Sequence, residues 1–131
     1  MRPAGSARQD TAATRAKDAL GRYGENLAAR HLDDDGFVVL ERNWRCDQGE
    51  IDIVARDGDV LVVCEVKTRS SLRHGTPFEA VTQRKLHRLE RLGMRWIRER
   101  GLRPTALRID VVSVLRPPQG RAVVEHIRGL T

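Results

Sequence analysis

Two carboxylates and a lysine in the middle of the chain have the types and spacing that metal-assisted hydrolysis requires. Glu65 and Lys67 lie two residues apart, so they point to the same face if the segment is a β-strand, and Asp52 lies in the segment before it. Close carboxylates repel each other unless a cation lies between them, and oxygen ligands favour Mg²⁺ or Mn²⁺ over zinc. With Lys67 to orient the attacking water, the pattern predicts hydrolysis of a phosphodiester.

The turn between these two segments decides whether the carboxylates face each other. The run Asp57-Gly58-Asp59 has strong turn chemistry and predicts a β-hairpin. A two-residue loop of Gly58 and Asp59 would place Asp52 directly opposite Glu65, with their Cβ atoms about 5 Å apart. A two-residue loop of Asp57 and Gly58 would keep the same faces matched, whereas a three-residue loop would separate the two carboxylates onto opposite faces.

The alternative interpretation is that these charges form the solvated face of an ordinary strand. Residues 60–64 are all apolar, which is typical of a strand that is buried on both faces. Charged groups at the end of such a strand need partners. From the residues alone, a metal site and a structural group of charges both stay open.

The elements around the hairpin predict an α/β protein with a mixed sheet. Apolar positions at three- and four-residue spacing predict a helix over residues 15–35. Residues 1–14 lack this period, so we expect a flexible arm followed by one domain over residues 15–131. The other expected elements are strands at 37–45, 50–56 and 60–68, a loop at 70–77, a helix at 78–100, and strands at 107–115 and 122–127.

The composition excludes several classes of protein. The chain has 131 residues, 40% of them hydrophobic, and a net charge of +6. It has no apolar run long enough to cross a bilayer and no apolar segment of a secretory signal, so we expect a soluble, cytoplasmic protein with no membrane partner. The two cysteines, Cys46 and Cys64, have no zinc-ligand or disulfide-framework spacing, and the four histidines are scattered. We expect reduced thiols, with Cys64 as a small buried residue.

The basic excess is concentrated in the second expected helix and its C-terminal flank. Five arginines follow the helical period on one face of this helix: Arg84, Arg88, Arg91, Arg95 and Arg98. Such a stripe suits contacts with the phosphates of a nucleic acid, although a solvated, arginine-rich face is the alternative. We expect Trp44 and Trp96 to lie in the core. Asp110 follows Arg108 at strand spacing, so a structural ion pair with Arg108 is one possible role for it, and its role stays open.

These motifs together resemble known nucleases. An acid on one strand followed by Glu-x-Lys on the next, within the order α-β-β-β-α-β, resembles the PD-(D/E)xK nuclease superfamily. More narrowly, residues 20–115 are similar to the YraN family of bacterial proteins. The matching motifs are Gly24-Glu25, Asn43-Trp44-Arg45, Gly49-Glu50-Ile51-Asp52, Glu65-Val66-Lys67-Thr68-Arg69, Gly75-Thr76-Pro77, Glu79-Ala80-Val81, Lys85 and Arg108-Ile109-Asp110.

The resemblance implies a restriction-endonuclease-like αβββαβ core, similar to that of archaeal Holliday-junction resolvases. It implies that Asp52 and Glu65 bind Mg²⁺ or Mn²⁺, that the carbonyl of Val66 adds a ligand, and that Lys67 serves the nucleophile. Glu25 would complete the acidic cluster from the first helix. The resemblance also implies a homodimer.

The sequence thus predicts a metal-dependent endonuclease that acts on DNA, with branched or junction DNA as the substrate that the resemblance implies. Two other functions stay open. The chain could be a nucleic-acid-binding module that uses the nuclease fold without cutting, or a component whose arginine stripe meets an acidic protein partner.

Overall fold

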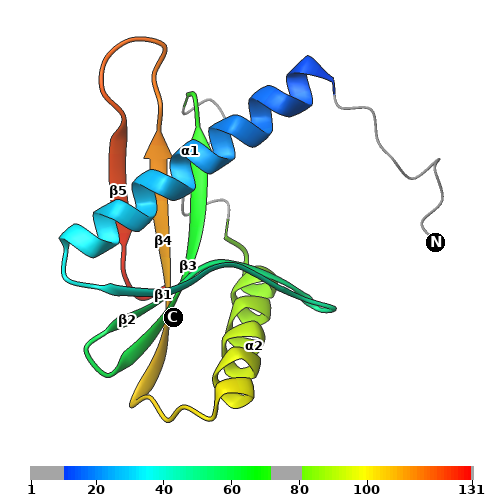
Figure 1. The fold of residues 1–131 in the computed structure, drawn as a ribbon, viewed down its shortest axis with the longest axis vertical. Helices are drawn as coiled ribbons and strands as arrows, with labels where there is room; N and C mark the ends of the chain where they lie inside the picture. Colours follow the sequence, from blue (N-terminus) through cyan, green and yellow to red (C-terminus); the bar gives the residue numbers. More distant parts are fainter. Residues whose placement is uncertain (1–10, 72–80, 131) are drawn as a thin grey trace, which may run out of the picture.

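The computed structural model of the chain describes residues 11–71 and 81–130. Two helices and five strands lie in this part of the chain, in the order that the sequence predicts (Figure 1). Their bounds are α1 Ala12–Asp34, β1 Val38–Cys46, β2 Gly49–Asp57, β3 Val60–Arg69, α2 Gln83–Arg100, β4 Ala106–Leu115 and β5 Val123–Ile127. Each strand begins and ends within one residue of the predicted bounds.

The five strands form one mixed sheet in the order β1-β2-β3-β4-β5. Strands β3 and β4 are parallel and are joined through α2, whereas the other neighbouring pairs are antiparallel. Figure 1 shows α1 and α2 on either side of this sheet. The predicted α/β class, with a mixed sheet flanked by helices and a restriction-endonuclease-like core, is confirmed.

The hairpin of β2 and β3 has the register on which the site depends. Ile53 pairs with Cys64 and Asp57 pairs with Val60, so the loop contains two residues. Gly58 in this loop has a φ of 60°, a left-handed conformation that glycine adopts without strain. The predicted two-residue loop is therefore confirmed, and the carboxylates of the site lie on one face.

The two helices differ from the predictions at their first residues. Helix α1 begins at Ala12, earlier than the predicted start at residue 15, while residues 1–10 of the predicted arm lie outside the described residues. Helix α2 begins at Gln83 because the Thr82 side chain accepts a hydrogen bond of 3.2 Å from the backbone N–H of Lys85. The predicted start at residue 78 is wrong, because residues 81 and 82 are not helical. Most of the predicted loop at residues 70–77 lies within residues 72–80, which are outside the described part of the chain.

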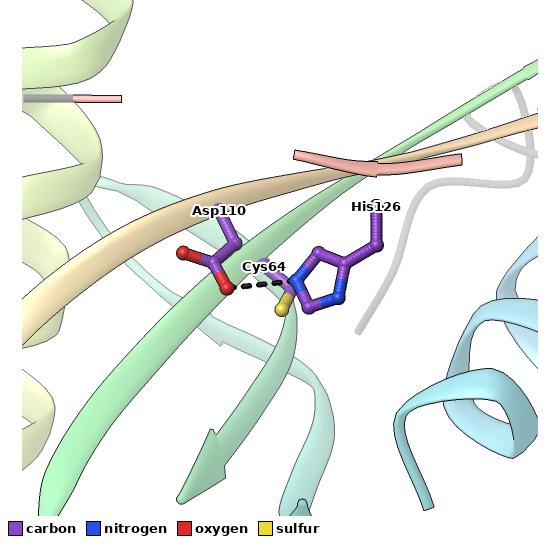
Figure 2. Close-up of side chains that lie close together, drawn as sticks. All are labelled: Cys64, Asp110 and His126. Carbon is purple, nitrogen blue, oxygen red and sulfur yellow. Dashed lines mark hydrogen bonds and ion pairs between the residues drawn. The ribbon is translucent and has the colours of Figure 1, made fainter. Parts of the chain in front are cut away.

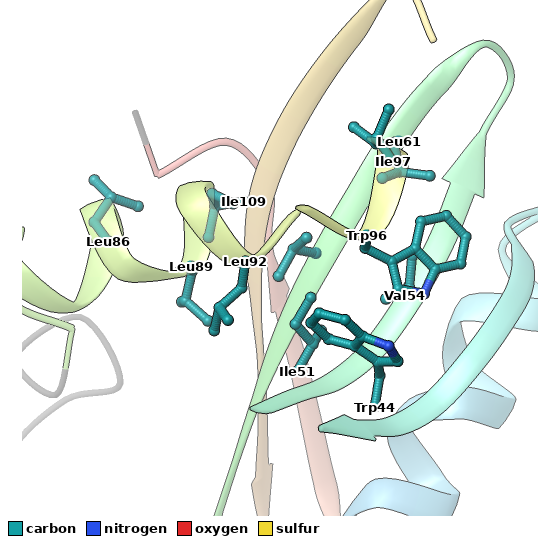
Figure 3. Packing of buried hydrophobic residues seen from close by; sticks show 11 residues of the cluster. Trp44, Ile51, Val54, Leu61, Leu86, Leu89, Leu92, Trp96, Ile97 and Ile109 are labelled. Atoms are coloured by element: carbon teal, nitrogen blue, oxygen red, sulfur yellow. The ribbon is translucent and has the colours of Figure 1, made fainter. Parts of the chain in front are cut away.

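Each helix buries its apolar side against one face of the sheet. Figure 3 shows α2 packed on one face through a cluster that contains Leu89, Leu92 and both tryptophans, Trp44 and Trp96. The predicted core position of the tryptophans is confirmed, and the indole N–H of Trp96 donates to Glu41 at 2.9 Å. The other cluster packs α1 on the opposite face. Among the described residues, neither helix is both long and apolar enough to span a membrane.

Close packing of α1 on the end of β3 depends on a glycine. A Cβ atom at Gly24 would overlap the side chain of Thr68, the residue that follows Lys67. Any larger residue at this position must push α1 away from the strand that carries the Glu-x-Lys motif. Gly24 therefore sets the distance between the helix and the site.

We expect Gly24→Ala to lower the free energy of unfolding by about 1 to 3 kcal/mol, because the added methyl group overpacks this contact. Gly21 is the matched control, since it lies one turn earlier in α1 and a Cβ atom added there would have no other atom within 4 Å. Gly21→Ala should leave stability unchanged or raise it by up to about 1 kcal/mol, as a more favourable helix residue. Urea unfolding of both variants is the measurement, and equal effects would contradict the packing argument.

Candidate active site

Asp52 and Glu65 come together where β2 and β3 separate. The paired register of the two strands extends to Ile53 and Cys64, which places Asp52 and Glu65 as the next residues on either strand. The Asp52 carboxylate accepts the backbone N–H of Val66 at 2.9 Å, so a side chain takes the place of a partner strand at this point. The two carboxyl groups are also hydrogen-bonded to each other.

These carboxyl groups open into a cleft of about 400 Å³. One wall is the tip of the hairpin of β1 and β2, and the other is the first half of α2. Apart from Cys46 and small or apolar side chains, the lining residues are charged: Arg45, Glu50, Asp52, Glu65, Lys85 and Arg88. The cleft therefore combines an acidic floor with basic groups on both walls.

The two carboxylates have opposite pKa shifts. Burial, then the hydrogen bond and the charge of Glu65, raise the pKa of Asp52 to about 7, although the N–H of Val66 acts in the other direction. Burial would raise the pKa of Glu65 as well, but hydrogen bonds from Asp52 and Lys85 hold it below its ordinary value. Near neutral pH the pair therefore takes up a proton in about half of the molecules, with Asp52 as the group that is protonated first, as expected for two close carboxyl groups.

Two lysines lie beside the pair. The Lys85 ammonium is 2.7 Å from Glu65 Oε2, and the amino group of Lys67 lies near it. Burial, and then the neighbouring positive charge of Lys85, lower the pKa of Lys67. Burial would lower the pKa of Lys85 too, but the hydrogen bond to Glu65 and the charge of that carboxylate raise it. The structure thus adds Lys85 to the predicted group of Asp52, Glu65 and Lys67.

Sequence reasoning assigned no role to Lys85. Its spacing from the Glu-x-Lys motif predicts nothing, since it lies on a different element on the far side of residues 70–80. One signal was its presence among the motifs of the resemblance. A second signal is its position: it is a lysine at the border between the apolar face and the arginine stripe of α2.

Glu25 is buried on α1 and is held by β1. Its Oε1 accepts hydrogen bonds from Arg42 Nε at 2.8 Å and from Asn43 Nδ2 at 3.0 Å. Asn43 has a φ of 55°, which turns its backbone into the left-handed region at this contact. Within the described part of the chain, these bonds do not join Glu25 to Asp52 or Glu65, so its predicted place in the acidic cluster stays a prediction.

The five arginines of the predicted stripe have different surroundings. Arg95 is half-buried and pairs with Asp47 on the β1–β2 turn and with Glu99. The other four are exposed, and no ion pair involves them among the described residues: Arg84, Arg88, Arg91 and Arg98. Arg88 lines the cleft beside Glu65, and both Arg88 and Arg91 line the adjoining hollow. The free arginines nearest the carboxylates are therefore in the first half of α2.

A second group of titratable side chains lies behind the site, on the face of the sheet that α1 covers (Figure 2). Cys64, Asp110 and His126 place ligand atoms within 4.8 Å of one another and could hold a metal ion. The scattered histidines did not predict this group, because β3, β4 and β5 bring it together from distant positions. Asp110 is fully buried and accepts a hydrogen bond of 2.8 Å from His126 Nε2.

The partners of this group favour a structural role. Arg108 donates two hydrogen bonds to Asp110, at 2.9 and 3.0 Å, and the backbone N–H of Gly129 donates a third. Arg108 and Asp110 therefore form the ion pair that the sequence left as one of the open roles of Asp110. Burial raises the pKa of the Cys64 thiol, which disfavours the thiolate that a metal needs.

Comparisons with known proteins agree on one family. A model of the family described as "Uncharacterised protein family UPF0102" matches residues 24–114. The chain is 62% identical over 120 residues to a UPF0102 protein from Nocardioides sp., covering 92% of this chain and 97% of that protein. It is 59% identical over 116 residues to one from Beutenbergia cavernae, covering 88% and 98%. It is 60% identical over 117 residues to one from Streptomyces coelicolor, covering 88% and 90%.

We expect Asp110→Asn to lower the free energy of unfolding by about 1.5 to 3 kcal/mol, because Arg108 loses its hydrogen bonds to a buried carboxylate and keeps only its ion pair with Asp57. Asp35→Asn is the control, since the pair of Asp35 and Arg128 is half-exposed and should contribute about 0 to 1 kcal/mol. Thermal unfolding in the presence and absence of EDTA is the measurement. A stability that falls with EDTA as much as with Asp110→Asn would contradict the structural role and favour a bound metal.

Proposed function

The chain belongs to the uncharacterised protein family UPF0102, and we propose that it is a metal-dependent nuclease that hydrolyses phosphodiester bonds in DNA. The observation that carries this proposal is the pair of Asp52 and Glu65, which lie on neighbouring strands in a cleft lined by basic groups. A buried pair of carboxyl groups with opposed pKa shifts is typical of a functional site. Basic groups on both walls of the same cleft suit a substrate with negatively charged phosphates.

The donor set at this pair fits a hard divalent cation. Asp52 and Glu65 would hold Mg²⁺ or Mn²⁺ through oxygen atoms, and the resemblance adds the carbonyl of Val66. When bound, the ion supplies positive charge that offsets the charge developing on the phosphoryl oxygens. It would also remove the repulsion between the two carboxylates, which otherwise requires a shared proton.

The side chains of the chain itself supply positioning. Lys67 shares the face of Glu65, and we propose that its Nζ atom orients the water that attacks the phosphorus atom. The P–O bond to the leaving oxygen then breaks, and the products are an alcohol and a phosphomonoester. Arg88 contacts the phosphate from the α2 wall of the cleft. Glu25 supports the position of α1, or completes the acidic cluster as the resemblance implies.

We propose that the DNA backbone follows the first half of α2. Three arginines there are exposed and free of ion pairs within the described residues, so each can neutralise a phosphate: Arg84, Arg88 and Arg91. Arg98 can extend this track, whereas Arg95 is engaged by Asp47 and Glu99. Branched or junction DNA as substrate, and a homodimer as the acting form, are proposals that rest on the resemblance alone.

Cleavage of labelled duplex, single-stranded and four-way-junction DNA tests the proposal directly. We expect cleavage with Mg²⁺ or Mn²⁺, none with EDTA, and a loss on the order of 100-fold or more for Asp52→Asn. Asp59→Asn is a control on the exposed turn of the same hairpin and should cleave like the wild type. Salt-sensitive DNA binding that survives Asp52→Asn, with no cleavage under any condition, would favour the non-catalytic binding module.

The pKa of Asp52 predicts how ion binding depends on pH. Since the ion binds the ionised carboxyl group and the pKa of Asp52 is about 7, affinity for Mn²⁺ should rise as pH increases through 7. Between pH 6 and pH 8 the ionised fraction increases about tenfold, and affinity should follow. Calorimetric titration with Mn²⁺ at pH 6, 7 and 8 measures the affinity. At pH 6 and 7, binding of the ion should also release a proton from Asp52. A flat profile in the wild type, or the same profile in Asp52→Asn, would contradict the assignment.

A further inference from the structure

The Lys85 ammonium lies where an added cation would have to bind. Its Nζ atom is 2.7 Å from Glu65 Oε2, and the Glu65 side chain is only 12% exposed. Lys85 is 30% exposed and lines the cleft together with Asp52. One oxygen of the acidic pair is therefore already neutralised by a cation that belongs to the chain.

The position of Lys85 in its helix is electrostatically unfavourable. It is in the first turn of α2, next to Arg84, and this turn contains no acidic residue. Cations in the first turn of a helix are disfavoured by the positive end of the helix dipole. Thr82 caps the helix and thereby fixes the backbone of Lys85. The side chain of Lys85 is long and flexible, so its ammonium group can reach more than one anion. The contact with Glu65 is therefore what offsets the unfavourable location.

We propose that Lys85 is an internal counter-ion that leaves Glu65 when a divalent cation and a DNA phosphate bind together. An ammonium group and a divalent cation on the same carboxylate repel each other, so Glu65 can bind one of them well at a time. The displaced ammonium requires another anion, and a phosphate held in the cleft by Arg88 supplies one. The inference rests on the proposed function, since it assigns the metal ligands in the same way.

This exchange couples metal binding to DNA binding. In the absence of DNA, Lys85 competes with the ion and weakens its binding. A bound phosphate takes up Lys85 and removes the competition, so each ligand increases the affinity for the other. Lys85 is thus a positioning residue that favours loading of the metal site when a phosphodiester is already in place.

Ion binding without DNA is the first test. We expect Lys85→Met to bind Mn²⁺ about tenfold more tightly than the wild type in electron paramagnetic resonance titrations, within the usual range of such couplings. Lys85→Arg keeps the charge and should bind like the wild type, and Lys85→Gln repeats the neutral change with a polar side chain. Lys17→Met, on the exposed side of α1, controls for the loss of a general positive charge.

DNA binding with and without Ca²⁺, an ion that oxygen ligands also bind, measures the coupling. In fluorescence anisotropy with a short DNA duplex, Ca²⁺ should tighten binding by about fivefold or more in the wild type and by less than about twofold in Lys85→Met. Equal or weaker Mn²⁺ binding by both neutral variants, or equal coupling by Ca²⁺, would overturn the inference. If the wild type cleaves DNA but either of these results is found, the inference about Lys85 fails and the proposed nuclease function stands. If neither the wild type nor any variant binds Mn²⁺ or cleaves DNA, both proposals fail.

Discussion

The repulsion between two carboxyl groups at the end of one β-hairpin is the constraint around which this protein is arranged. Asp52 and Glu65 meet because the register of β2 and β3 places them opposite each other just where the paired backbone ends. Such a pair needs positive charge or a proton. The ammonium of Lys85 supplies positive charge to Glu65, and the raised pKa of Asp52 favours a proton on the other carboxyl group. A bound divalent cation would take over this role.

Both layers of the fold hold this arrangement in place. On one face, Gly24 allows α1 to pack closely against the strand that carries Glu65. On the other face, the apolar side of α2 packs on the sheet and brings Lys85 and Arg88 to the cleft. Beneath α1, the buried carboxylate of Asp110 accepts hydrogen bonds from Arg108, His126 and a backbone N–H, and these bonds join strands β4 and β5.

Local patterns in the sequence predict most of this fold, since strands, turn and helices depend on neighbouring residues. The two-residue turn at Gly58 is such a pattern, and it determines the register that joins Asp52 to Glu65. The pairing of Lys85 with Glu65 depends on how α2 crosses the sheet after β3, which no local spacing encodes. The same holds for the group of Asp110 and His126, whose members come from separate strands.

Ion pairs divide the arginines of α2 into two groups that the helical period does not distinguish. Arg95 and Arg100 are engaged by acidic residues of β1, of its turn and of α2, and Arg100 also lies over the Trp96 ring. These contacts tie the second half of α2 to the hairpin that forms the opposite wall of the cleft. The first half of the helix keeps Arg84 and Arg88 exposed, and Arg88 lines the cleft that contains the acidic pair. The two halves of α2 therefore differ in role. The arginines of the C-terminal half stabilise the wall of the cleft, whereas those of the N-terminal half are free to contact the phosphate that we propose binds in the cleft.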